Sequence, residues 1–333
     1  MNGVRNTQHE VLNSSNCGLD RRFDQPHAPP MNVYYSDHYT LPLPPGHRFP
    51  IEKYRMLRDL LFAEGIIHPS ELKESPLTPP ETLALAHTTE YIEGMRTGSI
   101  SEQNLKRLGF PWSPGLYDRS CASVGGAIAA MKDALKGGIA GNLAGGTHHS
   151  HADRGEGYCV FNDLAVATRL MKRDKLARRI AIIDLDVHQG NGNSSILRQD
   201  EGVFIFSMHG EKNYPFVKVP SHLDIALPDG TEDEAYLEHL ADGLIEIRRF
   251  DPDYIFYQMG VDPLKEDTLG KLHLTFDGLM KRDELVLSYA HRAGIPVSLA
   301  LGGGYARPIE LSVRAYANTY RVAKQIYSGP VGI

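Results

Sequence analysis

The stretch "RIAIIDLDVHQGNG" (residues 179–192) decides the fold, because an apolar run leads directly into charged residues and glycines. The run is short and rich in β-branched residues, as expected of a strand buried on both faces. Three other runs share this form: "GVFIFSMH" (202–209), "DYIFYQMGVD" (253–262) and "IPVSLALGGGY" (295–305). Helical patterns follow at 231–250, 277–293 and 308–327. This alternation predicts an α/β fold with a mainly parallel central sheet and helices on both faces.

The chain has 333 residues, of which 41% are hydrophobic, so it is long enough for one large or two small domains. Residues 1–30 are polar and end in "PHAPP", which predicts a flexible N-terminal extension. No linker, repeat or change of composition interrupts the remainder. We therefore expect a single catalytic domain over residues 31–333.

Charge and cysteine content narrow the classes of protein. A net charge of −6 and a pI near 6.2 give no overall basic character, so direct nucleic-acid binding is not expected. The three cysteines, Cys17, Cys121 and Cys159, are far apart and form no CxxC pair, which argues against a disulfide framework and a thiolate zinc site. The sequence shows neither an apolar leader nor a run of about 18 apolar residues. These features predict a cytoplasmic protein without a membrane span.

Polar residues follow each predicted strand, and in open α/β sheets ligands bind beyond the carboxyl ends of the strands. Asp184, Asp186 and His188 are spaced two apart, so they project to one face of an extended chain. Buried carboxylates need a cation or hydrogen-bond donors, and Asp262 ends another strand. Asp186, His188 and Asp262 would form a mixed oxygen and nitrogen set suited to catalytic Zn²⁺. The alternatives are a solvated Asp-rich turn and, for Asp262, a turn or helix-cap aspartate.

The stretch "GGTHHSHADRGEGYCVFND" (145–163) supplies candidate acid–base groups. His148 and His149 could exchange protons with water and a leaving amine. Asp184 and Asn191 are the candidate hydrogen-bond partners that would set the tautomer and basicity of these histidines. The alternative is a histidine pair in a glycine loop with no catalytic role. Tyr305 follows three glycines and could donate to an oxyanion. A phosphate-binding loop is disfavoured because the GxGxxG pattern is missing.

Six segments together resemble the histone deacetylase superfamily, which has the arginase/deacetylase fold, and within it the class IV deacetylases and their bacterial relatives. They occur in the expected order: "HRFPIEKY" (47–54), "GFPWSP" (109–114), "GGTHHSHADRGEGYCVFNDLAVA" (145–167), "IIDLDVHQGNG" (182–192), "FSMHGEKNYPF" (206–216) and "LGGGY" (301–305).

The resemblance implies a role for each matching residue. Asp186, His188 and Asp262 match the zinc ligands, and His148 and His149 match the acid–base pair, with His149 at the position of the base. Tyr305 matches the tyrosine that polarises the acyl carbonyl. Asp184 and Ser207 match a structural potassium site, and Asp184 also lies behind the first histidine. The residues assigned to the acyl-lysine channel are Gly157, Tyr158, Tyr214 and Gly303.

Three residues depart from the family pattern or have no role in it. Asn191 stands where class I members have an aspartate, as in class II and IV sequences, and should make His149 less basic. His222 stands where class IV relatives are expected to have aspartate, and no role is assigned to it. His151 has no catalytic counterpart and is predicted to be a bystander.

The predicted function is zinc-dependent removal of acetyl or longer acyl groups from lysine Nε amines of proteins. His149 would take the proton of the attacking water, Zn²⁺ and Tyr305 would stabilise the oxyanion, and a histidine would protonate the leaving amine. One alternative is a deacetylase of acetylpolyamines or other small acylated amines. Another is a non-catalytic module that only binds acyl-lysine. A manganese-cluster hydrolase is disfavoured because "DLDVHQG" lacks the DxHxD arrangement.

Overall fold

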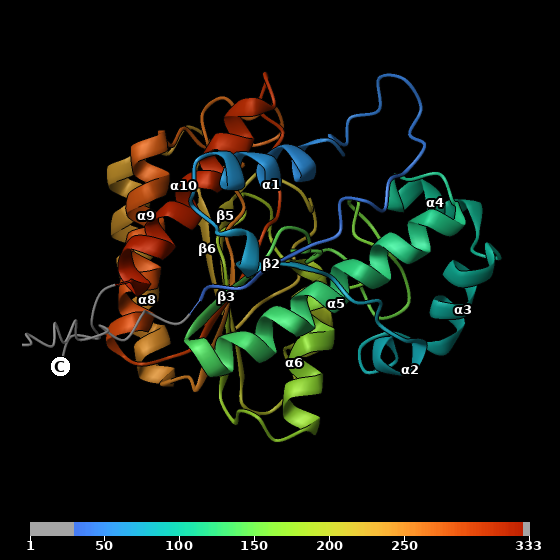
Figure 1. Cartoon of the computed structure of the whole chain (residues 1–333), viewed down its shortest axis with the longest axis horizontal. Coiled ribbons are helices and arrows are strands. Elements are labelled where there is room, and N and C mark those ends of the chain that lie inside the picture. The colour runs from blue at the N-terminus through green and yellow to red at the C-terminus, as the bar shows by residue number, and fades with distance from the viewer. Residues whose placement is uncertain (1–29, 329–333) are drawn as a thin grey trace, which may run out of the picture.

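The computed structural model describes residues 30–328, so all but residue 30 of the predicted N-terminal extension lies outside the described part. The centre of the molecule is a single eight-stranded sheet in the order β2-β1-β3-β8-β7-β4-β5-β6, with every neighbouring pair parallel (Figure 1). The strands are β1 (Val33–Tyr35), β2 (Leu72–Glu74), β3 (Ile139–Asn142), β4 (Ile180–Asp184), β5 (Val203–Gly210), β6 (Leu223–Leu227), β7 (Tyr254–Gln258) and β8 (Val297–Ala300).

Helices cover both faces of this sheet. Figure 1 shows α8, α9 and α10 along one side and α5 and α6 along the other, while α2, α3 and α4 form an outlying group beside α5. The helices are α1 (Lys53–Ala63), α2 (Pro80–Leu83), α3 (Thr89–Thr97), α4 (Glu102–Leu108), α5 (Pro114–Gly137), α6 (Asp163–Arg173), α7 (Asn191–Leu197), α8 (Asp233–Phe250), α9 (Phe276–Arg292) and α10 (Glu310–Tyr327). Within residues 30–328, no helix is both long and apolar enough to cross a membrane.

The predicted α/β class and the layered arrangement are confirmed. The four predicted strands correspond to β4, β5, β7 and β8, although the predicted runs extend by up to five residues into the turns that follow β7 and β8. The three predicted helices correspond to α8, α9 and α10, with ends that differ by at most two residues. All five residues of β4 and of β7 are buried, which explains why these strands are apolar on both faces. The sheet is parallel throughout, so the expectation of a mainly parallel sheet is met in full.

A buried ion pair supports the turn that follows β7. Arg282, on α9, is fully buried and pairs with Asp283 at 2.8 Å. Its guanidinium also donates to the carbonyl oxygens of Gly260 (2.5 Å) and Met259 (3.4 Å). The Asp283 carboxylate accepts further hydrogen bonds from Tyr257 and Thr319. This network fixes the backbone just before Asp262.

Replacing Arg282 by methionine should lower the free energy of unfolding by about 3–5 kcal/mol, because it leaves the Asp283 carboxylate buried without its cation. The loss is measured by urea denaturation at neutral pH. Arg292→Met, at the exposed end of the same helix, should change the free energy by less than about 0.5 kcal/mol. Equal stabilities of the two variants would show that the buried pair does not support the turn.

Candidate active site

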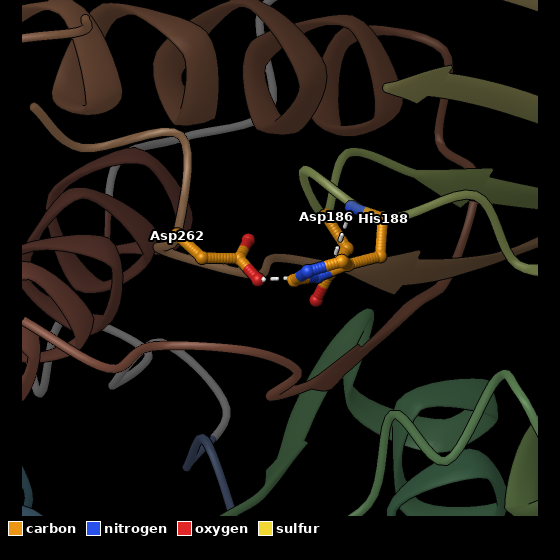
Figure 2. A group of neighbouring side chains, drawn as sticks. All are labelled: Asp186, His188 and Asp262. Atoms are coloured by element: carbon orange, nitrogen blue, oxygen red, sulfur yellow. Dashed lines mark hydrogen bonds and ion pairs between the residues drawn. The ribbon is translucent and has the colours of Figure 1, made fainter. Parts of the chain in front are cut away.

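Asp186, His188 and Asp262 meet beyond the carboxyl ends of two adjacent strands. β4 and β7 pair in parallel, with Asp184 opposite Gln258, so the turns that follow them emerge side by side. Nδ1 of His188 lies 3.0 Å from Oδ1 of Asp186 and 3.0 Å from Oδ2 of Asp262. Figure 2 shows the imidazole between the two carboxylates. One ligand atom from each residue lies within 4.8 Å of the others, which makes this group a candidate metal centre.

The chemistry of the three side chains fits a divalent cation. Oδ1 of Asp262 accepts from the Val187 amide (2.9 Å), whereas its buried Oδ2 lies 3.0 Å from Nδ1 of His188 and makes no well-aligned hydrogen bond. Burial and the neighbouring Asp186 raise the pKa of Asp262 to about 7, and a nearby cation would favour its charged form. The absence of a side chain at Gly303 leaves room for the carboxylates of Asp186 and Asp262, because a Cβ there would lie 1.8 Å from Oδ2 of Asp262. Two oxygens and one imidazole nitrogen suit Zn²⁺ with open positions for water or substrate.

The tandem histidines lie beside this centre, each with its own partner. Nδ1 of His148 lies 2.8 Å from Oδ2 of Asp184, and Nδ1 of His149 lies 2.7 Å from Oδ1 of Asn191. The two rings are 4.1 Å apart between centroids, and that of His149 is 5.9 Å from the ring of His188.

The turn that carries the histidines is tied to the start of α6. Asp163, the first residue of that helix, accepts hydrogen bonds from the backbone amides of Gly146 (3.0 Å) and Thr147 (2.9 Å). It also accepts from the Thr147 hydroxyl at 2.6 Å. Asp163 therefore fixes the chain immediately before His148.

The two histidines differ in electrostatic environment. Burial lowers the pKa of His149 well below its usual value, and the charges of His148 and His188 lower it further. Burial acts against the charged form of His148 as well, but the carboxylates of Asp184 and Asp186 outweigh it and raise the pKa. Adjacent groups whose pKa values are pushed apart are suited to act as base and acid.

Tyr305 is held at the edge of the same cavity. Its amide donates to Oδ2 of Asp267 at 2.6 Å, and its ring lies 6.3 Å from that of Tyr158. Lys53 is buried under the glycine run and donates to the carbonyl oxygens of Gly302 (3.2 Å) and Gly304 (3.4 Å). Sequence reasoning missed Lys53 and Asp267, although "HRFPIEKY" contains the lysine.

A cavity of about 430 Å³ leads to these groups, within the range of about 300–1,000 Å³ found for small-molecule sites. Gly157, Tyr158, Tyr214 and Gly303 all line it, as do His148, His149 and Tyr305. The ring of Tyr158 packs near Phe49 (5.4 Å) and Phe110 (5.2 Å). Tyr214 meets His149 edge-on at 4.9 Å, so one channel wall lies against the acid–base pair.

Three other residues singled out in the sequence, Ser207, His222 and His151, do not line the cavity. Ser207 is buried opposite Asp184 in the paired strands, with its hydroxyl 3.0 Å from Nδ1 of His209. His222 lies away from the cavity lining, where its Nδ1 accepts from the Ile205 amide at 3.1 Å. His151 is buried, with Nε2 3.2 Å from Nδ2 of Asn191. Sequence reasoning did not anticipate that His151 contacts the partner of His149.

Glu156 is a second residue that sequence reasoning missed. Its Oε1 accepts from Nδ2 of Asn191 at 2.6 Å and lies 3.4 Å from Nε2 of His151. Burial would raise the pKa of Glu156, but hydrogen bonds from His151, Asn191 and Tyr214 outweigh it and lower the pKa to about 2. No spacing pattern pointed to Glu156, because its position depends on how the loop before Tyr158 folds back.

Comparison with known proteins gives a consistent assignment. The Histone deacetylase domain model matches residues 47–320. An uncharacterised protein of Picosynechococcus is 43% identical over 299 residues, covering 89% of this chain and 98% of that protein. Histone deacetylase 2 of Arabidopsis thaliana is 29% identical over 290 residues, covering 83% and 75%.

A solved structure gives the same result. The crystal structure of an HDAC homolog complexed with SAHA superimposes with a TM-score of 0.77 at 26% identity, covering 91% of this chain and 85% of the other. The matched residues span the histidine turn, both metal-ligand turns and the glycine run described above. The chain therefore belongs to the histone deacetylase family, whose members are hydrolases that act on amides.

Proposed function

We propose that this protein is a zinc-dependent deacylase that removes acyl groups from lysine side chains of proteins. The observation that carries the proposal is the placement of two buried histidines, whose pKa values are shifted in opposite directions, beside an Asp–His–Asp centre in a cavity walled by aromatic rings. Asp186, His188 and Asp262 would hold the ion. When bound, Zn²⁺ supplies a Lewis acid for the acyl carbonyl and lowers the pKa of water.

The chain's own residues would divide the proton transfers. His149 is the base, because burial keeps its ring neutral and its Nδ1 is occupied by Asn191, which leaves Nε2 to accept a proton. Burial opposes the charged form of His148, but the nearby carboxylates of Asp184 and Asp186 raise its pKa, which suits it to donate to the departing amine. Tyr305 lines the cavity and would donate to the oxyanion as it forms.

The cavity suits a lysine stem with an acyl group. Its walls include the rings of Tyr158, Tyr214 and Phe110, which would pack against the methylene groups of lysine. Apolar residues such as Leu116 and Val160 also line it, so the lining can contact acyl carbons beyond an acetyl methyl. Both acetyl and longer acyl groups therefore remain within the proposal.

The rim of the cavity favours proteins over acetylpolyamines as substrates. Arg48, Lys212 and Lys271 line it and are exposed, and Nζ of Lys271 donates to the Lys212 carbonyl oxygen at 3.4 Å. Among the described residues that line the cavity, Asp186 is the only one with a carboxylate. An acetylpolyamine carries further ammonium groups, which these cations would repel. Phe216, 87% exposed, offers an apolar contact for a peptide at the same rim.

The wild-type protein should have a higher kcat/KM for acyl-lysine peptides than for acetylspermidine. The assay measures acid release from acetyl-, octanoyl- and myristoyl-lysine peptides and from acetylspermidine, side by side. Lys212→Glu/Lys271→Glu should raise kcat/KM for acetylspermidine by about tenfold, because two repulsive charges become attractive.

Lys281→Glu is the matched control, since it reverses an exposed charge on α9, outside the cavity lining. It should leave the ratio of the two substrates unchanged. A wild-type preference for acetylspermidine would favour the small-amine alternative. Absence of hydrolysis of every substrate would refute the proposed function.

A potassium ion is proposed beside the catalytic centre, with Asp184 and Ser207 as its candidate side-chain ligands. The two residues face each other across β4 and β5 and are both buried. The finer assignment, to the class IV deacetylases and their bacterial relatives, rests on the sequence motifs and is part of the same proposal.

A further inference from the structure

We infer that Glu156 is a positioning residue: it sets the orientation of the Asn191 amide and thereby the tautomer of His149. This inference deepens the proposed function, on which it rests, by naming what keeps the base in its active form. It starts from the short contact between Nδ2 of Asn191 and Oε1 of Glu156, 2.6 Å.

An ionised carboxylate can only accept hydrogen bonds, so the atom of Asn191 that faces Glu156 must be its amide nitrogen. Glu156 is ionised at neutral pH, since its hydrogen-bond partners hold its pKa at about 2. The reversed amide would place oxygen against oxygen at the same short distance. Nε2 of His151 lies 3.2 Å from Nδ2 of Asn191 and 3.4 Å from Oε1 of Glu156, so it contacts both members of this pair.

The orientation of the amide then decides the state of His149. With its nitrogen turned to Glu156, Asn191 presents Oδ1 to Nδ1 of His149 at 2.7 Å. That oxygen is an acceptor, so Nδ1 must carry the hydrogen of the neutral ring, and Nε2 keeps its lone pair. Without Glu156, either the oxygen or the nitrogen of the Asn191 amide could face the ring of His149. An aspartate at position 191 would present an oxygen in either orientation and would not need Glu156 to orient it.

The backbone holds both ends of this chain of contacts. Asn191 begins α7, and the Asn193 amide in its first turn donates to the His148 carbonyl oxygen at 3.1 Å. On the other side, the amides of Gly157 and Tyr158 donate to the carbonyl oxygens of Arg107 (3.2 Å) and Leu108 (2.9 Å) at the end of α4. Glu156 is therefore presented to Asn191 by a fixed loop.

Tyr214 joins the same carboxylate to the channel wall. A hydrogen bond between Tyr214 and Glu156 helps to lower the pKa of the carboxyl group. Since Tyr214 also packs edge-on against His149, Glu156 fixes the ring of the base through two neighbours. Cutting these contacts should disturb the proton transfer more than the binding of substrate.

The test compares kinetics and ring tautomers in the zinc-loaded protein. Glu156→Ala should lower kcat for the preferred acyl-lysine peptide by about ten- to a hundredfold and change KM little. Long-range ¹H–¹⁵N correlation spectra of histidine-labelled protein should show one tautomer of His149 in the wild type and a mixture in Glu156→Ala. The His149 signals are assigned by their loss in His149→Gln.

A swap of the two polar groups supplies the matched control. Asn191→Asp alone places two carboxylates in contact and should be strongly impaired. Adding Glu156→Gln returns a donor to the pair, so Asn191→Asp/Glu156→Gln should be more active than Asn191→Asp and should again show a single tautomer. This comparison also decides the matter if Glu156→Ala does not fold.

Wild-type kcat in Glu156→Ala, an unchanged tautomer in it, or no recovery in the swapped variant would overturn the inference. If Glu156 has only a structural role, Glu156→Ala should lower the melting temperature without changing the tautomer of His149. Failure of the proposed function is distinguishable, since the wild type itself would then hydrolyse none of the substrates.

Discussion

Replacing His149 by alanine should lower kcat for deacylation by about 10²–10⁴-fold, because the reaction loses its proton acceptor. The ring is neutral through burial, and Asn191 leaves its Nε2 unprotonated. Its place is tightly defined, since a Cβ on Gly157 would lie only 2.7 Å from Cδ2 of His149. KM should change little. Initial rates with the preferred acyl-lysine peptide, together with the zinc content of the purified protein, check this expectation.

His239→Ala is the matched control, because it removes an exposed imidazole on α8. Its kcat should equal that of the wild type. His149→Ala should retain its zinc, since His149 is not among the three metal-ligand candidates. A variant that keeps both its zinc and its wild-type kcat would show that the base is another residue.

Replacing Asp262 by asparagine should abolish both activity and stabilisation by zinc. In the wild type, zinc at a hundred times its Kd should add about 2.7 kcal/mol to the free energy of unfolding, and a chelator should remove this gain. Asparagine keeps an oxygen for the Val187 amide but replaces Oδ2, which lies 3.0 Å from Nδ1 of His188, by an amide nitrogen that cannot bind a cation.

Melting temperatures with zinc and with a chelator measure the stabilisation by zinc, and initial rates with the preferred acyl-lysine peptide measure the activity. Asp242→Asn makes the same change of charge at an exposed position on α8, and should keep the zinc-dependent shift and the activity. An equal zinc-dependent shift in Asp262→Asn would exclude Asp262 as a ligand.

The central strands could be predicted from the sequence, whereas the outer ones could not. β4 and β7 are apolar throughout because both faces are covered, and that pattern is visible without a structure. β1 and β2 have three residues each, and β3 reads "IAGN", too short and too small for a pattern. β6, at one edge of the sheet, alternates in burial and is not among the four predicted strands.

The residues of the candidate site that come directly after the central strands could be predicted from the sequence. The spacing of Asp186 and His188 after β4 placed them together, and parallel pairing brought Asp262 beside them. The contacts of Glu156 depend instead on a loop that reverses at Tyr158, whose φ is 65°. Left-handed backbone at a tyrosine is uncommon and has no local sequence pattern. Lys53 was missed for a similar reason, because its partners are backbone oxygens about 250 positions further along the chain.

Strand β8 is the last strand of the described residues, yet it lies between β3 and β7 in the sheet. Until residues 297–300 have been synthesised, β1, β2 and β3 cannot join β4, β5, β6 and β7, and β3 and β7 each leave an open strand edge. Such edges can pair with other chains during folding. Gly303 and Tyr305 lie in the turn that follows β8. A nascent chain therefore acquires a closed sheet and the complete set of proposed catalytic groups in the same late step, after a long period in which it is vulnerable to aggregation.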